Sequence, residues 1–198
     1  MKSFVAKILI SLLMVLALAG CSSEKEEEYA ETTLRVEKKG KVHETIVSSF
    51  TKDYYDINEL GSEFEKSVSD YNTAIGSEEI KFKGIRKKES DVFVDLYFTG
   101  PSDYESFIGE KLFVGTIGEA YDSGYTMDVT LKGVENGDKI GKVQIMGMPD
   151  RTVIILSEHV RVRTYRDIAY VSANVDVIGE KDARVISESD GLAYIVLK

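Results

Sequence analysis

Residues 56–76 read DINELGSEFEKSVSDYNTAIG, and this stretch decides the fold class. Its apolar residues recur every three or four positions, the period of one helix face; they are Ile57, Leu60, Phe64, Val68, Tyr71 and Ile75. Asp56 and Glu59 have the spacing of a capping box, and Gly76 stands where helices commonly end. The stretch therefore predicts one long amphipathic helix over about residues 56–75, with its apolar stripe laid on a sheet.

Segments on both sides of this helix have the composition of β-strands. Before it, residues 34–36 and 42–46 flank Lys39-Gly40, which indicates a hairpin. After it, residues 80–85 and 92–98 alternate, and a phase shift at Gly84 predicts a β-bulge. Further strands are expected at 127–131, 152–156, 160–165, 169–174, 175–178 and 192–197.

The connections between these segments are short, which favours antiparallel pairing. Pro101 and the polar residues after it are typical of the start of a short helix. The expected fold class is therefore α+β: a mostly antiparallel sheet with one long amphipathic helix and one or two short helices.

The N-terminus has the three parts of a secretory signal. Lys2 and Lys7 accompany an apolar run over residues 8–19, which is too short to span a bilayer. The run ends in Leu18-Ala19-Gly20-Cys21, which resembles the lipobox of bacterial lipoproteins. In that class residues 1–20 are removed and Cys21 carries a diacylglyceryl group and an acyl chain such as palmitate, enough for stable anchoring.

This reading divides the chain into three segments. Residues 1–20 are the lipoprotein signal peptide, and residues 21–31 are the lipidated cysteine followed by an acidic flexible tether. Residues 32–198 are expected to form a single α+β domain, because no second linker or internal repeat interrupts them.

Charge and cysteine content narrow the expected partners. The net charge is −9, and removal of Lys2 and Lys7 with the signal would leave −11. Such an acidic chain is a poor partner for nucleic acid and for anionic lipid headgroups, so membrane contact is expected through the lipid on Cys21. Because Cys21 is the only cysteine, its acylation would leave no thiol for disulfides, catalysis or metal binding.

One segment combines acidic and aromatic side chains and is the candidate ligand-contact site. Its members are Tyr104, Tyr121, Tyr125, Glu119 and Asp122. Exposed tyrosines favour contact with a protein, and acids beside aromatic rings also suit a glycan. A carboxylate enzyme that acts on glycan or peptidoglycan would need two carboxylates facing each other in a cleft. The candidates are Glu105, Glu110, Glu119 and Asp122.

Other catalytic or metal-binding patterns are missing from the sequence. His43 and His159 lie in separate strand-like segments, so neither a histidine-based zinc site nor a catalytic triad is expected. No calcium loop, nucleophile elbow or P-loop is present. We therefore expect no metal, no cofactor and no catalytic residue.

Three short segments carry a family resemblance: Asp53-Tyr54-Tyr55-Asp56, Phe113-Val114-Gly115-Thr116 and Asp190-Gly191-Leu192-Ala193-Tyr194-Ile195. With them the chain resembles a group of uncharacterised lipoproteins from Gram-positive, clostridia-type bacteria. The resemblance implies a lipid-anchored protein on the extracytoplasmic face of the cell membrane, and it assigns no functional residue.

The leading hypothesis is a non-enzymatic binding or structural module of the cell envelope, which contacts an envelope protein or glycan. Two alternatives stay open: the carboxylate enzyme described above, and an accessory subunit of a membrane complex.

Overall fold

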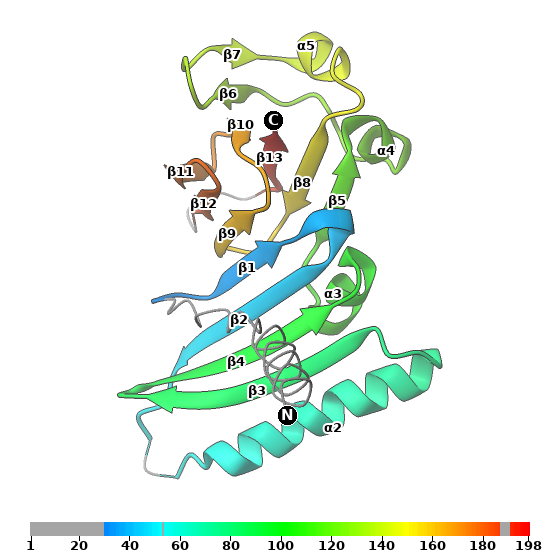
Figure 1. Cartoon of the computed structure of the whole chain (residues 1–198). Helices are drawn as coiled ribbons and strands as arrows, with labels where there is room; N and C mark the ends of the chain where they lie inside the picture. The colour runs from blue at the N-terminus through cyan, green and yellow to red at the C-terminus, as the bar shows by residue number, and fades with distance from the viewer. Residues whose placement is uncertain (1–29, 53, 187–190) are drawn as a thin grey trace, which may run out of the picture.

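The computed structural model describes residues 30–52, 54–186 and 191–198. The expected signal peptide at 1–20, Cys21 and most of the expected tether lie outside the described residues, and so do Asp53 and Asp190. The described residues form a mixed α/β structure with two mostly antiparallel sheets and four α-helices (Figure 1). None of the described helices has both the length and the apolar composition needed to cross a membrane.

Seven strands form the larger sheet: β1 (Thr33–Val36), β2 (Val42–Ser49), β3 (Ile80–Lys88), β4 (Asp91–Phe98), β9 (Arg161–Thr164), β11 (Val175–Gly179) and β12 (Asp182–Val185). Their spatial order is β11-β12-β9-β1-β2-β4-β3. A short 3-10 helix, η1 (Lys38–Gly40), joins β1 to β2 and so confirms the expected hairpin. The register of β3 against β4 shifts between Phe82 and Gly84, which confirms the expected bulge.

Six strands form the smaller sheet: β5 (Leu112–Thr116), β6 (Leu131–Gly133), β7 (Lys139–Ile140), β8 (Thr152–Leu156), β10 (Ile168–Ser172) and β13 (Ala193–Leu197). Their spatial order is β5-β8-β13-β10-β6-β7. The strand expected at 127–131 is wrong, because β6 begins only at Leu131. Met127 is nevertheless buried. An apolar residue at this position is therefore explained by core packing and not by strand pairing.

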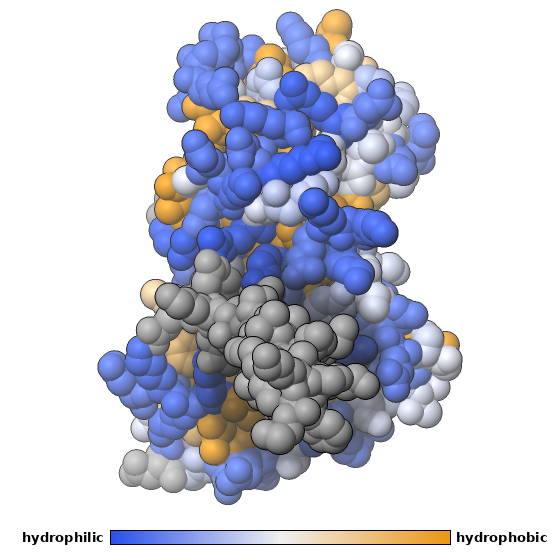
Figure 2. Space-filling model, viewed as in Figure 1, coloured by the Kyte–Doolittle hydropathy of each residue, from blue (hydrophilic) through white to orange (hydrophobic). Residues whose placement is uncertain are grey.

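The smaller sheet is covered on both faces. Ile154 and Ile195 belong to the core cluster that also contains the inner face of the larger sheet. Their neighbours Val153 and Ile155 belong to a second cluster with α4 (Ile117–Asp122) and α5 (Lys142–Met146). This alternation follows from the strand period of two, and two-sided burial explains the continuous apolar sequence of β8 and β13. Hydrophilic residues cover most of the face seen in Figure 2, with small apolar patches between them.

Helix α2 (Ile57–Ile75) lies along β3 (Figure 1). The Asp56 carboxylate accepts hydrogen bonds from the backbone N–H groups of Asn58 and Glu59 at 2.7 and 3.4 Å, which caps the helix. At the other end Gly76 has a φ of 74°, a left-handed conformation that glycine adopts without strain.

The apolar stripe of α2 is less buried than the sequence predicts. Within the helix, Gly61 and Val68 are the buried residues, whereas Phe64 and Tyr71 are half-buried and Ile75 is exposed. A Cβ atom at Gly61 would meet the Cγ2 atom of Ile85 at 3.0 Å. The helix therefore touches β3 closely at Gly61, while part of its apolar surface stays open to solvent.

Three details of the expected fold need correction. The strands form two sheets where one was expected, and β1 pairs with β9 in parallel. The short helix after Pro101 is confirmed as α3 (Pro101–Ile108), but α4 and α5 raise the short helices to three among the described residues. Helices of five or six residues carry too little periodicity to be recognised from sequence.

Candidate functional site

The connection between β2 and α2 is short and held at both ends. The Phe50 N–H donates to the Ser90 carbonyl at 2.6 Å, which ties the end of β2 to the turn between β3 and β4. The Tyr55 N–H donates to the Lys52 carbonyl at 3.1 Å, and the Asp56 cap follows directly. These bonds place Tyr54 and Tyr55 at the mouth of a groove between the sheet and the helix.

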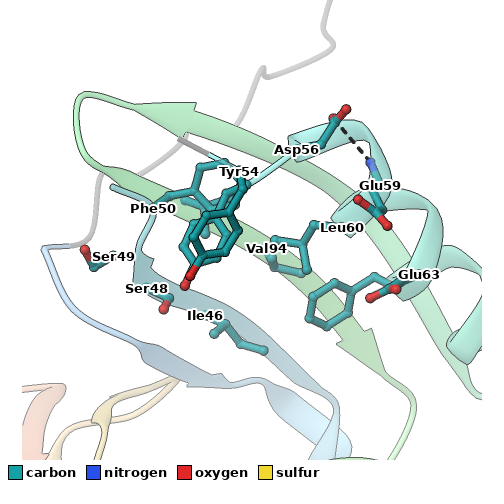
Figure 3. Close-up of a pocket in the computed structure, with 13 residues that line it drawn as sticks. Ile46, Ser48, Ser49, Phe50, Tyr54, Asp56, Glu59, Leu60, Glu63 and Val94 are labelled. Atoms are coloured by element: carbon teal, nitrogen blue, oxygen red, sulfur yellow. Dashed lines mark hydrogen bonds between the residues drawn. The ribbon is translucent and has the colours of Figure 1, made fainter. Parts of the chain in front are cut away.

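We call this hollow the α2 groove; its volume is about 450 Å³, within the range of small-ligand pockets. Its lining residues come from β2, the connection, α2 and β4: Ile46, Ser48, Ser49, Phe50, Tyr54, Tyr55, Asp56, Glu59, Leu60, Glu63, Phe64, Val92 and Val94. Figure 3 shows the Tyr54 ring over the hollow, with Ile46 and Ser48 on one side and the helix residues on the other.

The floor of the groove is set by strand register. Ile46 pairs with Val94, and Ser48 pairs with Val92, so these two rows share the inner face of β2 and β4. The open part of the α2 stripe, represented by Leu60 and Phe64, forms the opposite wall. The groove is therefore mainly apolar, and the serine and carboxylate side chains that line it are exposed.

Three aromatic rings form one cluster at the mouth. The ring centroids of Phe50 and Tyr55 lie 5.1 Å apart, and those of Tyr54 and Tyr55 lie 5.0 Å apart in an edge-on arrangement. Phe50 is buried, whereas Tyr54 and Tyr55 are 77% and 43% exposed. Rings held together by packing yet open to solvent are pre-ordered for contact with a ligand.

Carboxylates line the helical side of the mouth. Asp56, Glu59 and Glu63 are exposed and stand one helical turn apart along the first two turns of α2. The Lys87 ammonium also lies near the mouth, 5.2 Å from the centroid of the Phe50 ring. This arrangement can bind an apolar group by burial and a neighbouring positive group by charge.

The five residues that the sequence nominated do not form one site. Tyr104 is only 1% exposed, so its nomination as a surface contact is wrong. Tyr104 lies on the side of α3 that faces the core. Its ring packs edge-on against Phe98, with ring centroids 5.2 Å apart.

The other four nominated residues gather at α4 and just after it. Tyr121 is 50% exposed and Asp122 is exposed, whereas Tyr125 is half-buried with its ring 5.1 Å from that of Phe113. The Glu119 carboxylate accepts hydrogen bonds from the N–H and hydroxyl of Thr116, at 2.7 and 3.0 Å, and so caps α4. These bonds lower the pKa of Glu119 and assign it a structural role.

The remaining candidate carboxylates also make structural contacts. Glu105 forms an exposed ion pair with Lys111, 2.9 Å between Oε1 and Nζ. Glu110 accepts a hydrogen bond from the Ser157 hydroxyl at 2.7 Å. These contacts stabilise the start of β5 and the end of β8 and do not present two carboxylates to one substrate.

Sequence reasoning missed a buried carboxyl cluster between the two sheets. Glu44 in β2 is 1% exposed, and its Oε1 lies 3.5 Å from the Tyr104 hydroxyl. The same hydroxyl donates to Glu158, which follows β8. The Oε2 atom of Glu44 is buried without a hydrogen-bond partner among the described residues. The alternation of Val42, Glu44 and Ile46 on one strand face was the available signal for this burial.

The environment of this cluster favours protonation. Burial, followed by the negative charge of Glu158, raises the pKa of Glu44 from 4.5 to about 8. The pKa of Glu158 is raised as well, mainly by burial. Burial also raises the pKa of Tyr104, so its hydroxyl stays a donor at all ordinary pH values.

Neither histidine joins the α2 groove or the carboxyl cluster through a direct hydrogen bond. His43 lies on the outer face of the larger sheet, where its Nδ1 is 2.8 Å from Arg35 and its Nε2 is 3.7 Å from Asp95. His159 is exposed. Among residues 30–52, 54–186 and 191–198, no group of three or more His, Cys, Asp or Glu side chains is placed to hold a metal ion.

Comparison of the chain with protein-family models, with curated proteins and with solved structures found no match. The case for function therefore depends on the geometry of the α2 groove and on the sequence.

Proposed function

We propose that the protein is a lipoprotein on the extracytoplasmic face of the cell membrane and works as a binding module of the cell envelope. In this proposal the lipid on Cys21 holds the chain at the membrane, and the α2 groove receives an apolar group of an envelope partner. The observation that carries the binding role is the pair of exposed tyrosines, Tyr54 and Tyr55, packed together over an apolar groove.

The anchoring half of the proposal is supported by the sequence alone. Leu18-Ala19-Gly20-Cys21 directly follows an apolar run that is too short to span a bilayer. The acidic residues that follow Cys21 suit a spacer that keeps the domain away from anionic headgroups.

The binding half is supported by the incomplete cover of α2. A long amphipathic helix normally buries its apolar stripe, but Leu60 and Phe64 are left half-buried at the groove. Tyrosines exposed at such a hollow are characteristic of binding hot spots, where a ring is ordered before the partner arrives. A partner that fills the groove would complete the burial of these side chains.

A carboxylate enzyme is retained as the second candidate, because a pKa near 8 suits Glu44 to general acid–base chemistry. Burial counts against this candidate, since Glu44 is 1% exposed and a substrate would need the two sheets to separate locally. An accessory subunit of a membrane complex is a special case of the binding proposal, in which the partner is a membrane protein.

Co-purification from detergent extracts of native membranes tests both halves of the proposal. The wild-type chain should fractionate with membranes and retain its partner, whereas Cys21→Ser should appear in the soluble fraction. The double variant Tyr54→Ser/Tyr55→Ser should remain in the membrane and lose the partner, because both exposed rings of the groove are removed.

Tyr121→Ser is the control, since it removes from α4 a tyrosine whose exposure of 50% lies between those of Tyr54 and Tyr55. Unchanged membrane retention of Cys21→Ser would refute the anchor. Loss of the partner in Tyr121→Ser, together with its retention by the double variant, would place the contact site at α4 and not at the groove.

A further inference from the structure

We infer that the occupant of the α2 groove is a basic peptide segment of a protein partner, with one large apolar side chain flanked by lysine or arginine. This inference rests on the proposed binding function and specifies the chemistry of the partner. It follows from the combination of an apolar floor, exposed aromatic rings and carboxylates that form no ion pair among the described residues, all within one hollow.

The floor of the α2 groove fits one apolar side chain of the partner, because the hollow is shallow. The groove reaches the rows Ser48–Val92 and Ile46–Val94, and the next row on the same face is Glu44–Leu96. Glu44 and Leu96 are both buried, so the hollow is closed at that row. A single leucine, phenylalanine or similar side chain can therefore enter from the mouth and lie between the sheet and α2.

The carboxylates at the rim favour positively charged residues of the partner next to that apolar side chain. Asp56, Glu59 and Glu63 form no ion pair with any residue in the described part of the chain, and Asp56 already caps α2 through Oδ1. Three carboxylates on one helix face repel one another, and an incoming cation would relieve that repulsion. Anionic partners are disfavoured by the same charges.

The aromatic cluster offers a second contact for a cation. The Lys87 ammonium already lies over the Phe50 ring, 5.2 Å from its centroid. The exposed faces of Tyr54 and Tyr55 present the same kind of surface to a lysine or arginine of the partner. Acidic and aromatic groups thus meet at the groove mouth, where residues flanking an inserted apolar side chain would lie.

The inference predicts selective, salt-dependent binding of synthetic peptides by the detergent-solubilised full chain. The probes are fluorescein-labelled heptapeptides with a central leucine or phenylalanine and two lysines on each side. Matched peptides carry glutamate in place of lysine, or glycine in place of the central residue. Fluorescence anisotropy should detect binding of the lysine peptides only, and raising the salt from 0.05 to 0.5 M should weaken that binding about tenfold.

Variants separate the two parts of the contact. Glu59→Gln/Glu63→Gln should weaken lysine-peptide binding by roughly threefold to tenfold, because exposed ion pairs contribute modestly. Tyr54→Ser/Tyr55→Ser should abolish it. The control Glu65→Gln/Glu78→Gln removes two exposed carboxylates outside the α2 groove and should bind like the wild type.

Each contrary result overturns the inference in a distinguishable way. Equal binding of lysine and glutamate peptides would show that charge plays no part, and the proposed binding function would stand with a purely apolar occupant. Binding of glycans in an array without peptide binding would replace the peptide with a carbohydrate. Self-association of the full chain that is lost in Tyr54→Ser/Tyr55→Ser would assign the groove to a second copy of the protein.

Discussion

Between pH 5 and pH 9 the free energy of unfolding should fall by on the order of 4 kcal/mol, and Glu44→Gln should remove most of that fall. The reason is the difference in the Glu44 pKa, which is about 8 in the folded chain against an ordinary value of 4.5. Urea denaturation at a series of pH values measures the effect directly.

The direction of this effect follows from proton binding. Below pH 4.5 Glu44 is protonated in both states, so folding is not opposed. Between pH 4.5 and 8 the unfolded chain releases the proton first, which favours unfolding, and above pH 8 the loss is complete. Glu158, whose pKa is also raised by burial, acts in the same direction.

Other polar and titratable groups lie close to Glu44, and some of them contribute to the pH dependence of stability. Glu44 contacts Tyr104 and Glu158, and Glu158 is influenced in turn by Glu110 and the exposed His159. The control Glu65→Gln changes an exposed carboxylate on α2 and should leave the pH profile unchanged. A flat profile for the wild-type chain, or the same slope in Glu44→Gln, would contradict the assignment.

Phe98→Ala should lower the free energy of unfolding by about 3–5 kcal/mol, the usual cost of a large cavity in a packed core. Phe98 is fully buried at the end of β4, between Val42 and Ile80 in the sheet. Its ring meets that of Tyr104 at 5.2 Å and that of Phe107 at 6.1 Å, so it attaches α3 to the larger sheet.

The same substitution should alter the pH profile, which a simple loss of stability would not do. Tyr104 is held by Phe98 in the position from which its hydroxyl donates to Glu158. Loosening that ring weakens the hydrogen bond and shifts the titration of the cluster. Val143→Ala is the matched control, since Val143 is 83% exposed and its truncation should change stability little. A Phe98→Ala variant as stable as this control would contradict the packing of α3.

The sequence predicts local structure well where a short-range signal exists. The Asp56 cap, the Gly76 end of α2 and the Gly84 bulge are each set by neighbouring residues. Strand partners depend on contacts between distant residues, so neither the parallel pairing of β1 with β9 nor the division into two sheets follows from periodicity.

The candidate functional residues are harder to predict for the same reason. Tyr104 and Tyr121 each lie in a short helix beside acidic residues, yet Tyr104 is buried on the inner side of α3 and Tyr121 is exposed on α4. Tyr54 and Tyr55 carried a signal, since two adjacent rings in a polar connection cannot both be part of a regular apolar face. Their proposed binding role depends on the α2 groove, whose lining residues are brought together only when the chain folds.

The α2 groove is the surface at which we propose that a partner binds. Its most direct test is photo-cross-linking in intact cells, with the photoreactive residue p-benzoylphenylalanine placed at Ser49 on the groove wall or at Val143 on α5. We expect a defined cross-linked protein from position 49 and none from position 143. Cross-linking to one partner from position 143, with none from position 49, would contradict it.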